Sequence, residues 1–269
     1  MFWLSDEFRS RRRKTVKRTG KRLIRRLRGF LASQSLVSND PVLDPAQFAF
    51  LKPFEVRWQE IHAELLKILE HKESVPAFEE VSSDQKRIAK GGQWRTFILY
   101  GFGFKLEKNC AQAPRTTQLL EQVPNLQTAW FSILAPGYHI APHQGVTKGI
   151  LRCHLGLIVP DRPQDCYMRV DDRTCVWRPG ELVVFDDSYE HEVHNNTTQE
   201  RVILLFDFVR PMRFWGRVLN RLFIQGLKLT AYYREPKARL VSFEEQFEAA
   251  TRRADKMLDD LGDEATAPR

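Results

Sequence analysis

Short runs of hydrophobic residues fill the middle of the chain and alternate with polar residues at the two-residue period of β-strands. The run at 151–159 is the clearest, since alternation places Arg152, His154 and Gly156 on one face and apolar side chains on the other. Burying an unpaired polar group costs about 1–3 kcal/mol, so we interpret the polar face as one that contacts a ligand. Further strands are predicted at 94–100, 130–134, 174–177, 182–185 and 201–209.

Helical periodicity appears on both sides of this β-rich region. Apolar residues recur at three- and four-residue intervals from Phe54 to Leu69, which predicts one amphipathic helix over 53–71. The polar stretch at 72–90 is expected to form a loop over the site. Three more helices are predicted: a short one at 114–121, a cationic amphipathic one at 214–230, and a charged one that begins with a capping box at 242–245 and ends near residue 261.

Many short strands joined by Gly/Pro turns, with helices before and after them, indicate a mainly β (α+β) fold, a barrel or jelly roll with flanking α-helices. A length of 269 residues accommodates one such domain with terminal extensions. We divide the chain into a basic amphipathic segment at 1–37, a barrel domain with helical buttresses at 38–212, and amphipathic and charged helices at 213–269.

The net charge of +8 resides in the amino-terminal segment, because residues 1–30 contain twelve Lys or Arg and only two acids. Apolar residues at helical spacing lie among the basic residues of 9–31 and of 213–230. Such a stripe suits an anionic membrane surface better than a nucleic acid, because phosphate contacts do not require it. The competing interpretation is a solvated basic tail.

Nothing in the sequence predicts export. No apolar run reaches the length of a membrane-spanning helix, the amino terminus lacks the features of a signal peptide, and the four cysteines have neither disulfide density nor zinc-site spacing. We therefore expect a cytoplasmic protein that is peripheral on the inner face of the cytoplasmic membrane.

Two histidines and an arginine form the candidate site. His143 and His191 are 48 residues apart, each at the edge of a predicted strand, and Arg201 follows ten residues after the second. A barrel brings such strand ends together, so that two imidazoles bind one metal ion while a guanidinium holds a dicarboxylate beside it. This pattern favours an iron-dependent oxygenase.

Iron(II) oxygenases usually bind their metal with two histidines and one carboxylate. The position two residues after His143, where that acid is expected, holds Gly145. Three explanations stay open: an acid at 186, 187, 190 or 192 replaces it, water replaces it, or the metal is not iron. For Asp186 and Asp187 a turn or cap role is favoured over metal binding.

The motifs Pro-His-Gln-Gly at 142–145, Leu-Arg-Cys-His-Leu-Gly-Leu at 151–157 and Phe-Asp-Asp-Ser-Tyr-Glu-His-Glu-Val at 185–193, together with Arg201, resemble the aspartyl/asparaginyl β-hydroxylase family of Fe(II)- and 2-oxoglutarate-dependent dioxygenases. The resemblance implies a double-stranded β-helix of the cupin-like jelly-roll type, with Fe(II), 2-oxoglutarate and O2 taking part in the reaction. It implies that iron binds His143 and His191, that 2-oxoglutarate binds Ser132, His154 and Arg201, and that Arg152 and Trp94 line the co-substrate or substrate side. Glycine at 145 is then a trait of the aspartyl-hydroxylase branch.

The acceptor is the part of the function that the motifs leave open. The resemblance favours hydroxylation of an aspartyl or asparaginyl side chain in a peptide or protein. Four features resemble instead the bacterial lipid A acyl-chain hydroxylases: the Pro-x-Leu linker at 41–43, the Trp-Gln-Glu-Ile sequence at 58–61 in the predicted helix, the Trp-x-x-Phe strand and the Arg-Pro-Met sequence at 210–212. The acyl chain of lipid A or of an aminolipid is therefore the alternative acceptor. A non-catalytic, membrane-recruited barrel is the third interpretation, motivated only by the missing acid.

Overall fold

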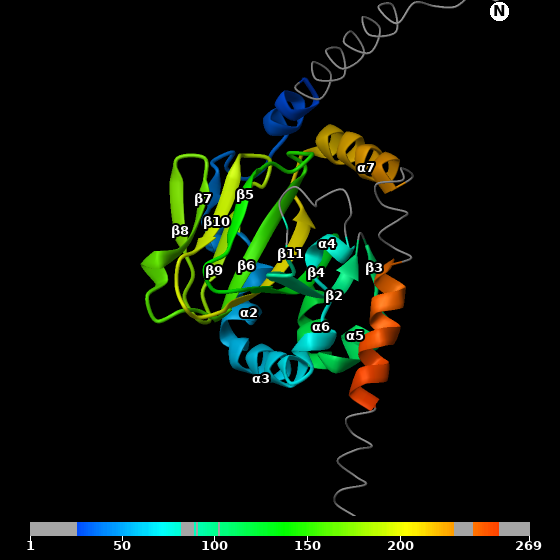
Figure 1. Cartoon of the computed structure of the whole chain (residues 1–269). Helices are drawn as coiled ribbons and strands as arrows, with labels where there is room; N and C mark the ends of the chain where they lie inside the picture. Colours follow the sequence, from blue (N-terminus) through cyan, green and yellow to red (C-terminus); the bar gives the residue numbers. More distant parts are fainter. Residues whose placement is uncertain (1–25, 82–88, 90, 102, 229–238, 253–269) are drawn as a thin grey trace, which may run out of the picture.

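Two antiparallel β-sheets face each other and form the barrel of a double-stranded β-helix (Figure 1). The structure, a computed structural model, describes residues 26–81, 89, 91–101, 103–228 and 239–252. The larger sheet has the strand order β1-β9-β6-β11-β4-β2-β3, and the smaller sheet has the order β5-β10-β7-β8. The predicted mainly β fold with flanking helices is confirmed.

The larger sheet consists of β1 (Val42–Leu43), β2 (Trp94–Gly101), β3 (Phe104–Lys105), β4 (Leu126–Leu134), β6 (Ile150–Ile158), β9 (Leu182–Phe185) and β11 (Arg201–Val209). The smaller sheet consists of β5 (His139–His143), β7 (Cys166–Val170), β8 (Arg173–Val176) and β10 (His191–Asn195). The helices are α2 (Lys52–Val56), α3 (Trp58–Leu69), α4 (Phe78–Val81), α5 (Glu107–Gln112), α6 (Pro114–Leu120) and α7 (Phe214–Lys228), with further helical residues at 26–33 and 239–252.

The larger sheet separates two hydrophobic cores. On one face, α2, α3, α5 and α6 cover the sheet, and Phe54 of α2 stacks on Phe206 of β11 with 4.8 Å between ring centroids. On the opposite face, Trp94 and Leu205 belong to a core shared with Val193 of the smaller sheet. Because the helices fill only one side, polar side chains of the larger sheet that point the other way meet inside the barrel.

Glutamates from other helices cap two short helices on the covered face. Neither α5 nor α6 has a side-chain cap at its own amino terminus. Glu64 of α3 accepts three hydrogen bonds of 2.7–2.9 Å from residues 115 and 116 at the start of α6. Glu244 accepts from the backbone N–H groups of 108 and 109, at 2.7 and 3.2 Å. The predicted capping box at 242–245 is therefore wrong: the helix is already formed at 239, and Glu244 caps α5 instead.

The predicted strands and the 114–121 helix are present, and the differences lie in shorter elements. The 53–71 helix is interrupted at Arg57, whose φ of −111° and ψ of 20° leave the helical region, so α2 and α3 are separate. The stretch at 72–90, expected as a loop, contains α4, and Phe78 of that helix stacks on Trp94 at 4.0 Å. Strands β5, β7 and β10 were not predicted.

Several predicted segments fall partly outside the described residues: 9–25 of the basic segment, 229–230 of the cationic helix and 253–261 of the last helix. No helix in the described part of the chain combines the length and apolar character needed to cross a bilayer.

Candidate active site

Neighbouring strands of the smaller sheet bring the two predicted metal ligands together. His143 on β5 and His191 on β10 are cross-strand partners in the antiparallel register. Their ring centroids lie 4.1 Å apart, with an interplanar angle of 52°. His191 is 2% exposed, and Phe185 packs edge-on against it. The two histidines are far apart in the sequence but lie side by side in the barrel.

Hydrogen bonds orient both imidazoles in the same way. Nδ1 of His143 lies 2.9 Å from the carbonyl oxygen of Ala141, and Nδ1 of His191 lies 3.0 Å from that of Tyr189. A carbonyl oxygen only accepts, so each Nδ1 carries the proton and each Nε2 offers a lone pair. Nε2 of His191 is buried without a hydrogen-bond partner among the described residues. Burial, with a smaller contribution from His143, lowers the pKa of His191 to about 3, so the ring is neutral. Two oriented, neutral imidazoles suit a divalent metal ion.

Arg201, the first residue of β11, is a buried cation for which the described residues supply no carboxylate partner. The residue is 1% exposed, its Nη1 donates a long hydrogen bond of 3.5 Å to Oγ of Ser132, and its guanidinium lies 4.8 Å from the ring centroid of Trp177. Burial lowers the pKa of Arg201 to about 10, so it stays protonated at neutral pH. Burying an uncompensated charge costs several kcal/mol, and an anionic ligand would remove that cost.

Trp94, Ser132 and His154 surround the same region. Trp94 donates from Nε1 to Oγ of Ser132 at 2.9 Å, and Nδ1 of His154 accepts from Nε1 of Trp177 at 3.3 Å. Burial lowers the pKa of His154 well below its usual value, so the ring is neutral and its Nε2 carries the proton. That buried N–H has no partner among the described residues. Together with Arg201, these groups form a site of hydrogen-bond donors and one cation that fits an anionic ligand.

Arg152 lies on the inner face of β6, and an acid compensates its charge. Its guanidinium donates two hydrogen bonds to Asp207, of 2.7 and 2.9 Å, and Asp207 also accepts from Thr128 at 2.6 Å. One nitrogen of Arg152 lies 3.6 Å from a carboxylate oxygen of Asp187. The structure therefore places Arg152 beside the site as part of an ion-pair network.

Asp187 occupies the space in which a side chain at residue 145 would lie. A Cβ atom on Gly145 would overlap the Asp187 carboxylate, and the backbone N–H of Gly145 donates to the carbonyl oxygen of Asp187 at 2.7 Å. Burial raises the pKa of Asp187 to about 7. Of the other predicted acids, Asp186 lies in a separate ion cluster, and Glu190 and Glu192 pair with a surface arginine. Asp187 is thus the acid among these four that adjoins the expected position.

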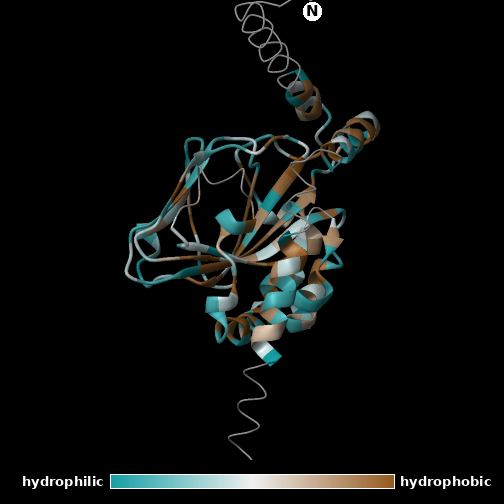
Figure 2. Ribbon diagram, turned by 45° about the vertical axis from the view of Figure 1, so that its right-hand side comes forward, coloured by the Kyte–Doolittle hydropathy of each residue, from teal (hydrophilic) through white to brown (hydrophobic). Residues whose placement is uncertain are grey.

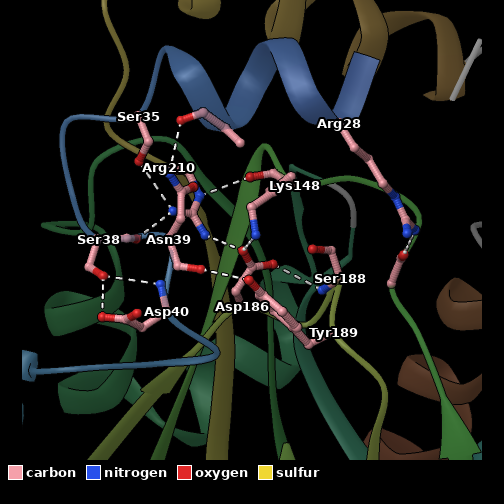
Figure 3. A network of polar contacts seen from close by, with 12 residues as sticks. Arg28, Ser35, Ser38, Asn39, Asp40, Lys148, Asp186, Ser188, Tyr189 and Arg210 are labelled. Carbon is pink, nitrogen blue, oxygen red and sulfur yellow. Dashed lines mark hydrogen bonds and ion pairs between the residues drawn. The ribbon is translucent and has the colours of Figure 1, made fainter. Parts of the chain in front are cut away.

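A buried cluster of ion pairs supports the loop that follows His143 and the loop that precedes His191 (Figure 3). Asp186 accepts from Nζ of Lys148 at 2.7 Å, pairs with Arg210, and accepts from the backbone N–H of Ser188 at 3.0 Å, which is the predicted turn role. Lys148 follows His143 along the chain, and Ser188 precedes His191. Arg210 also donates to the carbonyl oxygen of Ser38 at 2.9 Å. The cluster therefore joins both loops to the end of β11 and to the amino-terminal segment.

The sequence analysis missed Trp177. This residue is fully buried and contacts both His154 and Arg201. The predicted strand at 174–177 ended on this large aromatic residue, but its alternation did not indicate which side chain of the larger sheet it would meet.

Comparisons with known proteins relate the chain to one family of hydroxylases. The family model described as "Aspartyl/Asparaginyl beta-hydroxylase" matches residues 55–211. The ornithine lipid ester-linked acyl 2-hydroxylase of Rhizobium tropici is 38% identical over 213 residues, which are 79% of this chain and 76% of that protein. The human aspartyl/asparaginyl beta-hydroxylase is 33% identical over 166 residues, which are 60% of this chain and 21% of that protein. Among solved structures, a Pseudomonas putida prolyl-4-hydroxylase aligns with 58% of this chain and 88% of its own, at 18% identity and a TM-score of 0.37.

Proposed function

The chain belongs to the aspartyl/asparaginyl β-hydroxylase family, and we propose that it hydroxylates the acyl chain of an aminolipid at a membrane surface, using Fe(II), 2-oxoglutarate and O2. Its relatives are named hydroxylases, and family membership makes the protein a 2-oxoglutarate-dependent hydroxylase, which argues against the non-catalytic barrel. The observation that carries the proposed chemistry is the buried, uncompensated Arg201 in the same barrel as two oriented histidines.

In this proposal Nε2 of His143 and Nε2 of His191 hold the iron. The hydrogen bonds of both Nδ1 atoms to backbone carbonyls support the assignment, because they turn each Nε2 lone pair away from the backbone. The bound iron, with 2-oxoglutarate and O2, supplies the oxidant that removes hydrogen from an unactivated C–H bond. The carboxylate of Asp187 lies beside Gly145, but among the described residues it does not form a three-ligand group with His143 and His191, so the two histidines are the protein ligands of this proposal.

The chain's own residues bind and orient the co-substrate. Arg201 pairs with the distal carboxylate of 2-oxoglutarate, while Ser132 and the Nε2–H of His154 donate hydrogen bonds to the same molecule. Each charge-assisted hydrogen bond of this kind contributes about 1.5–3 kcal/mol. Because these groups are buried, water competes little for them once the ligand is in place.

The acceptor proposal depends on α7, which presents its large apolar side chains to solvent. Gly216, Asn220 and Ile224 face the protein. On the other side the helix exposes apolar side chains to between 37% and 68%, namely Phe214, Trp215, Val218, Leu219 and Leu222. The helix contains no acid, and exposed arginines stand at 213, 217 and 221. An apolar stripe flanked by arginines is typical of a helix that lies in the interface of an anionic membrane.

Helix α7 packs against the loop that leads away from the candidate site (Figures 1 and 2). Asn220 donates to the carbonyl oxygen of Gly149 at 2.8 Å, and Arg28 of the amino-terminal helix donates to that of Gly145 at 2.8 Å. Both acceptors belong to the loop that follows His143. The two helices adjoin, because the backbone N–H of Arg213 donates to residue 34 at 2.8 Å, and both carry hydrophobic segments in Figure 2. A membrane bound to them lies at the rim of the barrel, where an acyl chain would enter.

Two observations therefore favour the lipid over the aspartyl side chain, reversing the order that the motifs suggest. One is the exposed apolar face of α7. The other is the match to the lipid acyl 2-hydroxylase over most of both chains, whereas the match to the human enzyme covers 21% of that protein. Hydroxylation of an aspartyl side chain is the second candidate, supported by the latter match.

Mass spectrometry distinguishes the two acceptors. The purified protein is incubated with Fe(II), 2-oxoglutarate and O2, together with an aminolipid extract or with aspartyl- and asparaginyl-containing peptides. We expect one added oxygen atom on an acyl fragment of the lipid and an equal amount of succinate, both absent in H143A/H191A. Oxygen gain on the peptides alone would overturn the lipid proposal, and lipid oxidation without succinate would overturn the proposed chemistry.

Vesicle sedimentation tests the role of α7. Trp215→Glu combined with Leu222→Glu places two charges on the exposed apolar face, and we expect binding to phosphatidylglycerol vesicles to fall more than about tenfold. The matched control is Leu66→Glu combined with Val56→Glu, which places two charges on exposed apolar residues of α3 and α2, 46% and 66% exposed. Equal binding by the double variant and the control would contradict membrane docking through α7.

A further inference from the structure

We propose a second metal site, for a divalent transition metal of the zinc type, on the outer face of the smaller sheet. It consists of His139 on β5 with Glu192 and His194 on β10, three side chains that the proposed reaction does not use. Nε2 of His139 lies 2.9 Å from Oε2 of Glu192, and Nε2 of His194 lies 3.3 Å from the same oxygen. One ligand atom from each of the three residues lies within 4.8 Å of the other two.

This cluster shares strands with the candidate active site but not a face. Side chains alternate along β10, so His191 points into the barrel at 2% exposure, while Glu192 and His194 point outward with side chains 14% and 22% exposed. His139 is the register partner of His194, and its side chain is 43% exposed. The outer cluster is therefore open to ions from solvent, and the sheet itself separates it from His143 and His191.

Neighbouring residues hold the three ligands in place. Arg169 on β7 donates from Nε to Oε1 of Glu192 at 2.6 Å, which leaves Oε2 directed at the imidazoles. The rings of His139 and His194 stack with centroids 3.9 Å apart and an interplanar angle of 15°, and Tyr167 stacks on the far side of His194 at 4.9 Å. Because every one of these residues stands on a paired strand, their backbone positions are fixed, while the 43% exposed ring of His139 is free to rotate toward an ion.

Two imidazoles and one carboxylate are a common ligand set for zinc and related ions, with a fourth position left for water or an external ligand. Binding requires the proton of each ring to be on Nδ1. It also requires one ring to rotate out of the stack, because the in-plane lone pairs of two nearly parallel rings do not converge on one ion. A bound ion would link β5 to β10 through the pair His139–His194, three to four residues from His143 and His191. It would thus clamp the two strands that carry the proposed iron ligands.

Counting bound zinc tests the site without reference to catalysis. Wild-type protein, H139A/H194A, H143A/H191A and a control, H62A/H71A, are dialysed against Zn²⁺, and the metal per chain is measured by atomic spectrometry. The control removes two histidines of the helical face, His62 on α3 and His71 just after it. We expect two zinc ions in the wild type and the control, and one in each of the other variants. A full count of two in H139A/H194A, or one ion in the wild type that disappears only in H143A/H191A, would overturn the proposal.

Thermal melts give a second readout. We expect zinc to raise the melting temperature of H143A/H191A, in which only the outer cluster remains, and we expect this rise to vanish when H139A/H194A is added to it. If H143A/H191A does not fold, the difference of one ion between wild type and H139A/H194A decides. The inner pair is counted alone in H139A/H194A, so failure of the outer site and failure of the proposed iron site give different results.

Discussion

Replacing Arg201 with methionine should make the protein more stable and nearly abolish its binding of 2-oxoglutarate. Methionine keeps most of the length and apolar volume of the arginine stem but removes the charge. In the ligand-free protein that charge has no carboxylate partner among the described residues, and its guanidinium contacts Ser132 and the ring of Trp177. The same substitution therefore removes the free-energy cost of a buried charge from the ligand-free protein, and it removes the attraction for 2-oxoglutarate from the complex.

The size of the cost follows from the pKa. Burial lowers the pKa of Arg201 from 12.5 to about 10, which corresponds to roughly 3 kcal/mol. The pKa is lower in the folded state than in the unfolded state, and Arg201 is protonated in both states at neutral pH. The cost of burying the charge is therefore fully present at neutral pH and declines only as the pH rises through about 10. Loss of the Trp177 and Ser132 contacts offsets about 1–2 kcal/mol. We expect the free energy of unfolding to rise by about 1–2 kcal/mol, and 2-oxoglutarate affinity to fall at least about 100-fold through the loss of two charge-assisted hydrogen bonds.

Arg210→Met is the matched control, because Arg210 is equally buried at 1% exposure but pairs with Asp186. Breaking that pair should destabilise the fold by about 3–5 kcal/mol while leaving 2-oxoglutarate affinity unchanged. Thermal melts of both variants, with and without 2-oxoglutarate and Mn²⁺ under anaerobic conditions, measure the two effects. Wild-type affinity in Arg201→Met, or a loss of stability as large as that in Arg210→Met, would refute the reasoning.

Three further predictions concern packing around the site. Gly145→Ala should lower the free energy of unfolding by about 1–3 kcal/mol by overlap with Asp187, and adding Asp187→Gly should recover most of the loss in thermal melts. Glu64→Ala removes three hydrogen bonds from the start of α6 and should cost about 2–3 kcal/mol in denaturant titrations, whereas Glu60→Ala on the exposed side of α3 should leave the denaturation midpoint unchanged. His154→Leu removes one buried N–H without a partner but leaves the buried Nε1–H of Trp177 without its acceptor, so the two effects on the stability of the ligand-free protein oppose each other, while calorimetry should show roughly tenfold weaker 2-oxoglutarate binding; equal affinity would contradict the role assigned to His154.

Strand periodicity predicted the five longer strands of the larger sheet but only β8 of the smaller one, for a physical reason. The strands of the larger sheet lie between two hydrophobic cores, so their sequences are rich in apolar residues. In β5 and β10 one face lines the site and the other carries the His139–Glu192–His194 cluster, so polar residues occupy both faces. Such strands have no clear apolar alternation, so the sequence does not predict them. They are identified only from their hydrogen-bonded pairing in the structure.

The candidate site was predictable where its residues stand on regular strands. The polar face of β6 followed from alternation, whereas Arg201 was selected by its spacing from His191 and by the family resemblance. Asp187 and the Asp186–Lys148–Arg210 cluster were not predictable in this way, because loop conformation and contacts between distant segments decide where these charges meet.

The attachment of α7 has a consequence for how such enzymes diversify. The helix rests on the barrel through small and polar residues, with Gly216 against residue 34 and Asn220 hydrogen-bonded to the backbone of Gly149. The groups proposed to take part in the reaction, in contrast, stand on the β-strands of the barrel and not on α7. Exchanging α7 for another segment would therefore direct the oxygenase to a different interface or acceptor and leave its oxidation chemistry intact. A chimera that carries the corresponding segment of a peptide-modifying relative offers a direct route to altered selectivity.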